Sequence, residues 1–231
     1  MFYDPSYLLF MVPAFLLLFI AQVRVSRAYS KWGRIRNSHG LTGADAATRL
    51  LAYGGLGDVR LEGIRGQLTD HYDPRSNTLR LSAGVAQAPS VAALAISAHE
   101  IGHALQDREG YGPLRLRAAL VPAANIGSTL GWILIMIGLF LQMVPVAWLG
   151  VGAFGLGAVF ALATLPVEFN ASFRARRLLA DSGMLASEEE TRGVNSVLDA
   201  AALTYVAALA TAVLQLLYYV LMIAGIGRRR S

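Results

Sequence analysis

Charged residues are scarce in this chain, and cysteine is absent. Only 15% of the 231 residues are Asp, Glu, Lys or Arg, whereas an average soluble domain contains about 25%. Without cysteine the chain has neither disulfides nor thiolate metal ligands, so histidine and carboxylate side chains would have to hold any transition metal. Together with 55% hydrophobic residues, the low charge argues against a disordered chain and against an ordinary soluble globule.

Four long runs of the sequence contain no Asp, Glu, Lys or Arg. Each has at least about 17 residues, which is the length a helix needs to cross the hydrocarbon core of a bilayer. The runs are 7–23, 118–144, 146–167 and 203–226. The sequence therefore predicts a multi-pass membrane protein.

The basic residues predict how these spans are oriented. No Lys or Arg precedes the first run, as one would in a cleavable signal, and a basic cluster follows it instead. Segments 24–117 and 168–202 carry basic side chains near the span ends, and the 142–145 turn has none. The positive-inside rule places both segments in the cytoplasm of a cell whose inner (plasma) membrane holds the spans. The terminal arginines Arg228, Arg229 and Arg230 oppose this orientation.

The net charge of +5 at pH 7 raises the question of nucleic-acid binding. The basic residues gather at span ends rather than along one surface, which is typical of topology signals and contacts with lipid headgroups. The predicted partners are therefore the lipid bilayer and not nucleic acid. The oligomeric state is not predicted.

The segment 24–117 has its own secondary-structure signals. Thr42 is placed to cap a helix that ends before the Gly54-Gly55 pair. A short strand is expected over 59–64, and a hairpin over 67–72 and 78–82, joined by the turn residues of 73–77. Pro89-Ser90 precedes a helix expected over 91–106.

The last of these helices contains His99-Glu100-Ile101-Gly102-His103, which has the form H-E-x-x-H. Residues four apart lie on one face of a helix, so His99 and His103 can bind one metal ion. Glu100 is adjacent to the first ligand and can act on a metal-bound water as a base. From the composition, the number of such matches expected by chance is about 0.002. Zinc is the leading metal, although these ligands accept other divalent ions.

A catalytic zinc site needs a third protein ligand. The candidates are His39, His71, Asp107, Glu109 and Glu168. Asp107 lies about 12 Å further along the same helix than His99 and cannot reach the ion. Glu168 emerges from the third span on the predicted catalytic side, and a carboxylate there needs a partner. The alternative for Glu168 is an interfacial glutamate paired with Arg174 or with a lipid headgroup.

The chain resembles the YugP-type bacterial membrane zinc metallopeptidases over nearly its whole length. The resemblance rests on three runs, which are 68–74 (LTDHYDP), 99–106 (HEIGHALQ) and 165–172 (LPVEFNAS). The third run is also similar to the E-x-x-A-D ligand run of the wider membrane gluzincins, but here Asn170 and Ser172 stand where relatives often have acidic residues. The resemblance implies a peptidase with zinc bound by His99, His103 and Glu168.

The expected fold is mainly α, with four transmembrane helices and a cytoplasmic, zincin-like α+β segment that carries a small β-hairpin or sheet. The expected organisation is helix 1 in 1–23, a metallopeptidase segment in 24–117, helices 2 and 3 in 118–167, a segment with the third ligand in 168–202, and helix 4 with a basic tail in 203–231.

Two functions are compatible with these features. The preferred one is a membrane endopeptidase that uses one Zn²⁺ per chain and Glu100 as general base, acting on peptides or proteins, membrane proteins among them. His71 could contact the substrate or transition state, or could merely stabilise its turn. The alternative function is a non-catalytic membrane scaffold or adaptor with a structural zinc site, for which four protein ligands are usual.

Overall fold

The computed structural model describes residues 5–228 and has two compact units. The described residues of the first unit are 5–20, 115–166 and 204–228, and those of the second are 21–114 and 167–203. Four long helices have residues in both units. Each unit has its own core, and the two are described separately.

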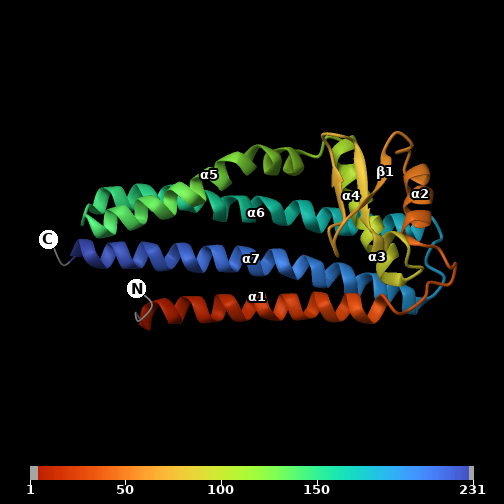
Figure 1. The fold of residues 1–231 in the computed structure, drawn as a ribbon, viewed down its shortest axis with the longest axis horizontal. Coiled ribbons are helices and arrows are strands. Elements are labelled where there is room, and N and C mark those ends of the chain that lie inside the picture. The colour runs from red at the N-terminus through yellow and green to blue at the C-terminus, as the bar shows by residue number, and fades with distance from the viewer. Residues whose placement is uncertain (1–4, 229–231) are drawn as a thin grey trace. The chain divides into compact units, whose positions relative to one another are not determined.

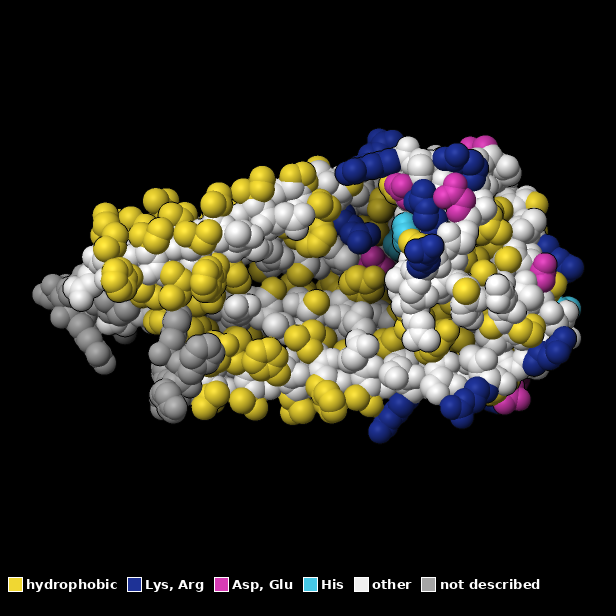
Figure 2. Space-filling model, viewed as in Figure 1, with side chains coloured by type: hydrophobic (Ala, Val, Ile, Leu, Met, Phe, Trp, Pro, Cys, Tyr) yellow, Lys and Arg dark blue, Asp and Glu magenta, His cyan; other side chains and the backbone are white. Residues whose placement is uncertain are grey.

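The first unit consists of the apolar parts of four helices (Figure 1). These helices are α1 (Pro5–Trp32), α5 (Gly112–Phe140), α6 (Val144–Asp181) and α7 (Glu188–Arg228). Each is long and apolar enough to cross a membrane. Hydrophobic side chains cover the visible surface of this unit (Figure 2), as expected for helices that face lipid. The prediction of four membrane-spanning helices is therefore confirmed by length and composition.

Glycines allow α5 and α6 to pack closely. A Cβ on Gly127 would lie 2.7 Å from the Ala153 carbonyl oxygen, and a Cβ on Gly150 would lie 2.6 Å from the Ile135 nitrogen. Real Cβ atoms do not approach backbone atoms so closely, so glycine is needed at these contacts. Small residues at helix–helix contacts are typical of membrane proteins, because association in lipid depends on close packing.

Aromatic side chains join α1 to α7 in the same unit. The rings of Tyr7 and Tyr218 meet edge to face with their centroids 5.3 Å apart. Tyr218 is fully buried and belongs to a small core with Ile135 and Ile223. This arrangement is a favourable one for two aromatic rings.

The second unit holds the remaining elements, which are short. They are α2 (Gly43–Tyr53), β1 (Arg60–Ile64), β2 (His71–Asp73), β3 (Thr78–Ser82), α3 (Ala83–Ala86) and α4 (Val91–Arg108). The strands form one sheet in the order β1-β3-β2, in which β1 runs parallel to β3 and β2 antiparallel to it. Strand β2 is therefore an edge strand.

Helix α4 lies in the core of the second unit. Its side chains at Leu94, Ala98 and Ile101 are fully buried. They belong to one hydrophobic cluster with residues of α2, β3, α6 and α7, among them Leu50, Leu79, Leu81, Leu179 and Leu198. A helix packed against so many neighbours is held in a fixed position, and so are the side chains that it presents.

The helix and turn signals of segment 24–117 are confirmed. Thr42 caps α2, and its hydroxyl accepts a hydrogen bond from the Asp45 N–H while the Asp45 carboxylate accepts one from the Thr42 N–H, which completes a capping box. Ser90 caps α4 through a 3.2 Å bond from the Ala93 N–H. In the hairpin turn, Asn77 has a φ of +47°, a conformation that asparagine tolerates better than most residues.

Several boundaries differ from the predicted ones. Strand β2 covers His71–Asp73 rather than 67–72. The turn between the second and third spans occupies 141–143, and α6 and α7 extend well past the apolar runs, so that 168–202 is mostly helical. Hydrophobicity marks the part of a helix that meets lipid and not the point where the helix ends. Arg229 and Arg230 lie outside the described residues, and the Arg228 side chain is not described.

Candidate metal centre

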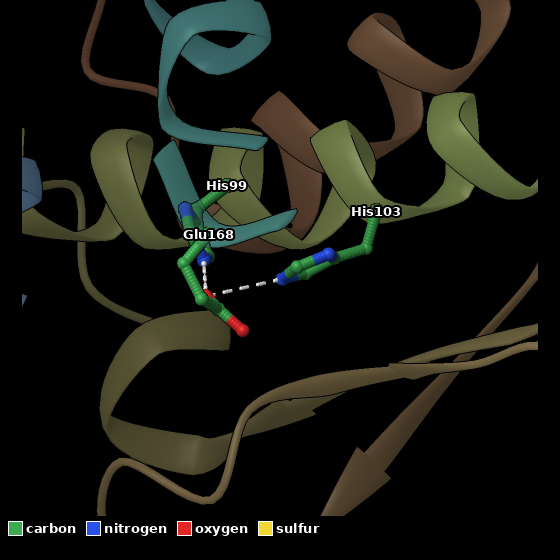
Figure 3. A group of neighbouring side chains, drawn as sticks. All are labelled: His99, His103 and Glu168. Atoms are coloured by element: carbon green, nitrogen blue, oxygen red, sulfur yellow. Dashed lines mark ion pairs between the residues drawn. The ribbon is translucent and has the colours of Figure 1, made fainter. Parts of the chain in front are cut away.

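Helices α4 and α6 bring two histidines and one glutamate together in the second unit. His99 and His103 project from α4, and Glu168 projects between them from α6 (Figure 3). The Glu168 Oε2 atom is 3.3 Å from His99 Nε2 and 3.6 Å from His103 Nε2. The Glu168 side chain is 2% exposed and the histidines are each 13% exposed. His99, His103 and Glu168, the ligands that the family resemblance implies, therefore lie close together in the structure.

These distances fit a zinc ion. Ligand atoms placed about 2.0–2.1 Å from a tetrahedral zinc are separated from one another by about 3.4 Å. The two distances from Glu168 to the imidazoles agree with this value, and all three ligand atoms lie within 4.8 Å of one another. Two imidazoles and one carboxylate also make up a common donor set of catalytic zinc sites, in which water occupies the fourth position.

Gln106 fixes which nitrogen of His103 is available for a metal. Gln106 is fully buried, and its Nε2 donates to the Val167 carbonyl at 2.8 Å and to Asn170 Oδ1 at 3.0 Å. Because a carbonyl can only accept, the amide nitrogen must face Val167 and the amide oxygen must face His103, where it lies 3.0 Å from Nδ1. His103 Nδ1 therefore carries a proton, which leaves Nε2 as the metal-binding atom.

Ser172 has the corresponding position beside His99. Its Oγ is 3.2 Å from His99 Nδ1, and it lies on α6 one turn beyond Glu168. A hydroxyl can accept the Nδ1 proton and so direct Nε2 to the metal, as a carboxylate often does. The partner beside His99 Nδ1 is thus a neutral hydroxyl.

The electrostatic environment of the centre favours a cation. Burial lowers the pKa of His103, but the neighbouring carboxylates of Glu168 and Glu100 outweigh burial and raise it above its ordinary value. The negative charges that stabilise a proton on His103 also stabilise a metal ion. Protons and metal therefore compete for this site, and metal binding should weaken as the pH falls.

Glu100 lies beside the centre but is not one of the three clustered residues. Its Oε2 accepts a 3.1 Å hydrogen bond from the Tyr72 N–H of β2. Burial raises the pKa of Glu100 above its ordinary value, while the neighbouring histidines act in the opposite direction. A carboxylate with a raised pKa is a better proton acceptor, which suits a general base.

Helix α4 approaches α6 closely at Gly102, between the two histidines. A Cβ on Gly102 would lie 2.5 Å from the Ala171 carbonyl oxygen. A side chain there would push α4 away from the helix that carries Glu168, so glycine sets the distance between the ligands. The sequence motif leaves this position unspecified, and its spacing gives no sign of the constraint.

We expect Gly102→Ala to weaken zinc binding and to lower stability by about 1–3 kcal/mol, the usual cost of overpacking. Alanine favours a helix by about 1 kcal/mol over glycine, so a loss must come from the contact with α6. Thermal unfolding in detergent, with and without zinc, measures both effects. Gly152→Ala in α6 is the matched control, because no atom lies within 4 Å of its added Cβ. Equal behaviour of the two variants would contradict the proposed constraint.

The other candidate ligands lie elsewhere. The Asp107 carboxylate accepts a 2.9 Å hydrogen bond from the Tyr72 hydroxyl. Glu109 forms a two-point ion pair with Arg174. Arg174 is the residue that the alternative prediction paired with Glu168. His71 Nδ1 lies 2.8 Å from the Thr69 carbonyl oxygen. Within residues 5–228, neither these side chains nor His39 belongs to the group that could hold a metal.

Sequence reasoning missed the groups that orient the histidines. Gln106 follows His103 by three residues and so lies on the same face of α4, a signal that was available in the sequence. Its second partner, Asn170, comes from α6 and also accepts a 2.7 Å bond from Arg174 Nε. That contact joins residues 64 positions apart, and no local sequence pattern predicts it.

Four helices long and apolar enough to cross a membrane, together with two histidines and one glutamate that could hold a metal ion, are the features of a membrane metalloprotein. Comparison with known proteins assigns the chain more closely. It belongs to the family described as "Putative neutral zinc metallopeptidase", whose sequence pattern matches residues 7–224.

A curated relative supports the same family. The chain is 43% identical over 206 residues to "Putative membrane protease YugP" of Bacillus subtilis (strain 168). That match covers 89% of this chain and 91% of the relative. No solved structure is significantly similar to the chain. The chain is thus a multi-pass membrane protein of a zinc metallopeptidase family.

Proposed function

We propose that the protein is an integral membrane zinc endopeptidase of the gluzincin type, with one zinc per chain bound by His99, His103 and Glu168. The observation that carries this proposal is the meeting of those three side chains at distances suited to zinc, with Glu100 beside them. Cleavage of an unstructured protein such as casein by the purified protein in detergent, with and without zinc, tests it.

The residues of the centre divide the chemistry between them. Zinc bound there would lower the pKa of a water molecule towards about 7 and polarise the substrate carbonyl. Glu100 would accept the proton of the attacking water and deliver it to the leaving amine. The Tyr72 N–H holds Glu100 Oε2, while Oε1 has no hydrogen-bond partner within the described part of the chain. That oxygen is available for the proton transfer.

Strand β2 provides a docking edge for an extended substrate. It is an edge strand, and its Tyr72 N–H points to Glu100 rather than to β3. The edge of β2 that is not paired with β3 therefore faces the base, and a peptide that adds there as a strand would place its backbone beside the centre. Backbone pairing suits peptide and protein substrates of varied sequence, membrane proteins among them. We also propose that His71, which precedes Tyr72 in β2, contacts the substrate.

A structural zinc site in a scaffold protein is the competing function. Structural sites usually use four protein ligands. The candidate group in residues 5–228 contains three. An open position and an adjacent carboxylate both favour catalysis, and this is why the peptidase is preferred.

The second unit is proposed to face the cytoplasm, with the spans in the inner (plasma) membrane. Basic residues near the span ends of segments 24–117 and 168–202 support this orientation. Cysteines introduced at Ser38 and Ser187 should therefore resist a membrane-impermeant maleimide in intact cells, and one at Ser6 should react. Both Ser38 and Ser187 are exposed, so they should react once the cells are opened. Labelling of Ser38→Cys and Ser187→Cys in intact cells would reverse the orientation.

A further inference from the structure

A hollow with basic walls lies between α1 and α7 in the second unit. Arg24, Arg27 and Lys31 line it from one face of α1, at the spacing that places side chains above one another on a helix. Ser196 and Asp199 line it from α7. Its volume is ≈ 390 Å³. We refer to it as the α1–α7 hollow.

Small residues make room for the hollow. Ala28 and Ala200 lie where the two helices meet, and each is only 8% exposed. Nearby, Trp32 packs so closely against α7 that a Cβ on Gly193 would lie 2.5 Å from its ring. The two helices are thus held together on one side of the hollow, and the short alanine side chains leave space that the long basic side chains surround.

The charges of the hollow are predominantly positive. Within residues 5–228, Arg24 and Arg27 have no hydrogen bond or ion pair, and Lys31 contacts only the ring of Trp32, with its Nζ 4.6 Å from the ring centroid. The one acidic group, Asp199, is already paired with Arg176. Three cations therefore surround a space whose single carboxylate is neutralised, and an anion placed there would be attracted.

Both helices reach the edge of the membrane at this hollow. Residues 6–23 of α1 carry no charge, and at 1.5 Å per residue they span about 27 Å, close to the thickness of the hydrocarbon core. Arg24 is the first charged residue after them. In α7, residues 200–227 are likewise uncharged, and Asp199 is the last charged residue before them. The α1 stretch therefore places the hollow at the depth of lipid headgroups, and the α7 stretch, at about 42 Å, is long enough to reach the same depth.

We propose that the α1–α7 hollow binds the phosphate of an anionic phospholipid. The basic side chains and the Ser196 hydroxyl are suited to phosphate oxygens. Ile20 and Leu17 lie one and two turns, respectively, before Arg24 on the same face of α1, and both are exposed, so acyl chains can lie along them. A soluble phosphate has no such second contact, and the depth of the hollow favours the lipid.

Native mass spectrometry of the full-length protein in detergent tests the proposal. Dioleoyl phosphatidylglycerol should bind saturably and dioleoyl phosphatidylcholine much more weakly. We expect Arg24→Gln combined with Arg27→Gln to weaken binding of the anionic lipid about 30-fold, because each basic residue near an anionic headgroup contributes about fivefold. Ser196→Phe should also weaken it, since a large ring fills the hollow without changing its charge.

Matched controls separate a site from general attraction. Arg34→Gln combined with Arg65→Gln removes the same charge from exposed residues outside the hollow and should leave lipid binding unchanged. An equal loss in this control, or unchanged binding in both hollow variants, would overturn the proposal. Inorganic phosphate that competes with the lipid at equal concentration would show a site for soluble phosphate and would overturn the assignment to lipid.

Discussion

Glu100→Gln should abolish most proteolysis while leaving the zinc content near one per chain. Glutamine has nearly the shape of glutamate, and its amide oxygen can still accept the Tyr72 N–H that now holds Glu100 Oε2. It cannot accept a proton from water, and general-base catalysis contributes about 10²–10⁴-fold to rate. We therefore expect kcat to fall by about that factor. The measurements are casein cleavage and zinc content on the same preparation.

A second glutamate variant serves as the control for Glu100→Gln. Glu62 lies on β1, where it forms an exposed ion pair with Arg80. Glu62→Gln makes the same chemical change away from the metal centre and should retain full activity. Loss of zinc from Glu100→Gln would mean that Glu100 is a ligand, and activity within twofold of the unmodified protein would mean that another group is the base.

Glu168→Ala should weaken zinc binding by more than about 100-fold, because even the groups that orient metal ligands are worth about 10–100-fold. The glutamate comes from α6 and the histidines from α4, so zinc should fasten these helices together and raise the melting temperature. At a zinc concentration 100 times the dissociation constant, linkage stabilises the fold by about 2.7 kcal/mol. The variant should lose this zinc-dependent rise, as followed by thermal unfolding in detergent.

The control for Glu168→Ala should be a glutamate that has no link to the metal centre. Glu109 is unsuitable, because Arg174 connects it to Asn170 and thus to Gln106, which holds His103. Glu188 in the first turn of α7 is 96% exposed and has one distant ion pair, so Glu188→Ala should leave the zinc effect unchanged. If Glu168→Ala bound zinc as tightly as the unmodified protein, the third ligand would have to be sought elsewhere, first at His71.

The parts of the fold that local chemistry determines could be predicted. The helix that carries His99 and His103 begins at its Ser90 cap and keeps the 3.6-residue period, so the spacing alone places both imidazoles on one face. The hairpin follows from the turn residues around Asn77, whose backbone adopts a left-handed conformation. The spans follow from their length and lack of charge.

Contacts between distant segments could not be predicted from such patterns. The parallel pairing of β1 with β3 joins two strands that β2 separates in the sequence, and no turn signal specifies it. The close approach of Gly102 to Ala171 depends on how two helices cross. Glu168 was expected at the centre because it follows a span and because of a family resemblance. Its position between the two histidines depends on how α4 packs against α6, which the sequence patterns do not specify.

Removal and return of zinc tests directly whether the protein is a zinc-dependent peptidase. The purified protein should be stripped with a chelator, dialysed, and titrated with zinc while casein cleavage is followed. A zinc-dependent peptidase with a His99–His103–Glu168 centre should lose its activity with the metal and recover it as zinc approaches one per chain. Cleavage that persists without metal, or zinc that rebinds at one per chain without restoring cleavage, would contradict the account.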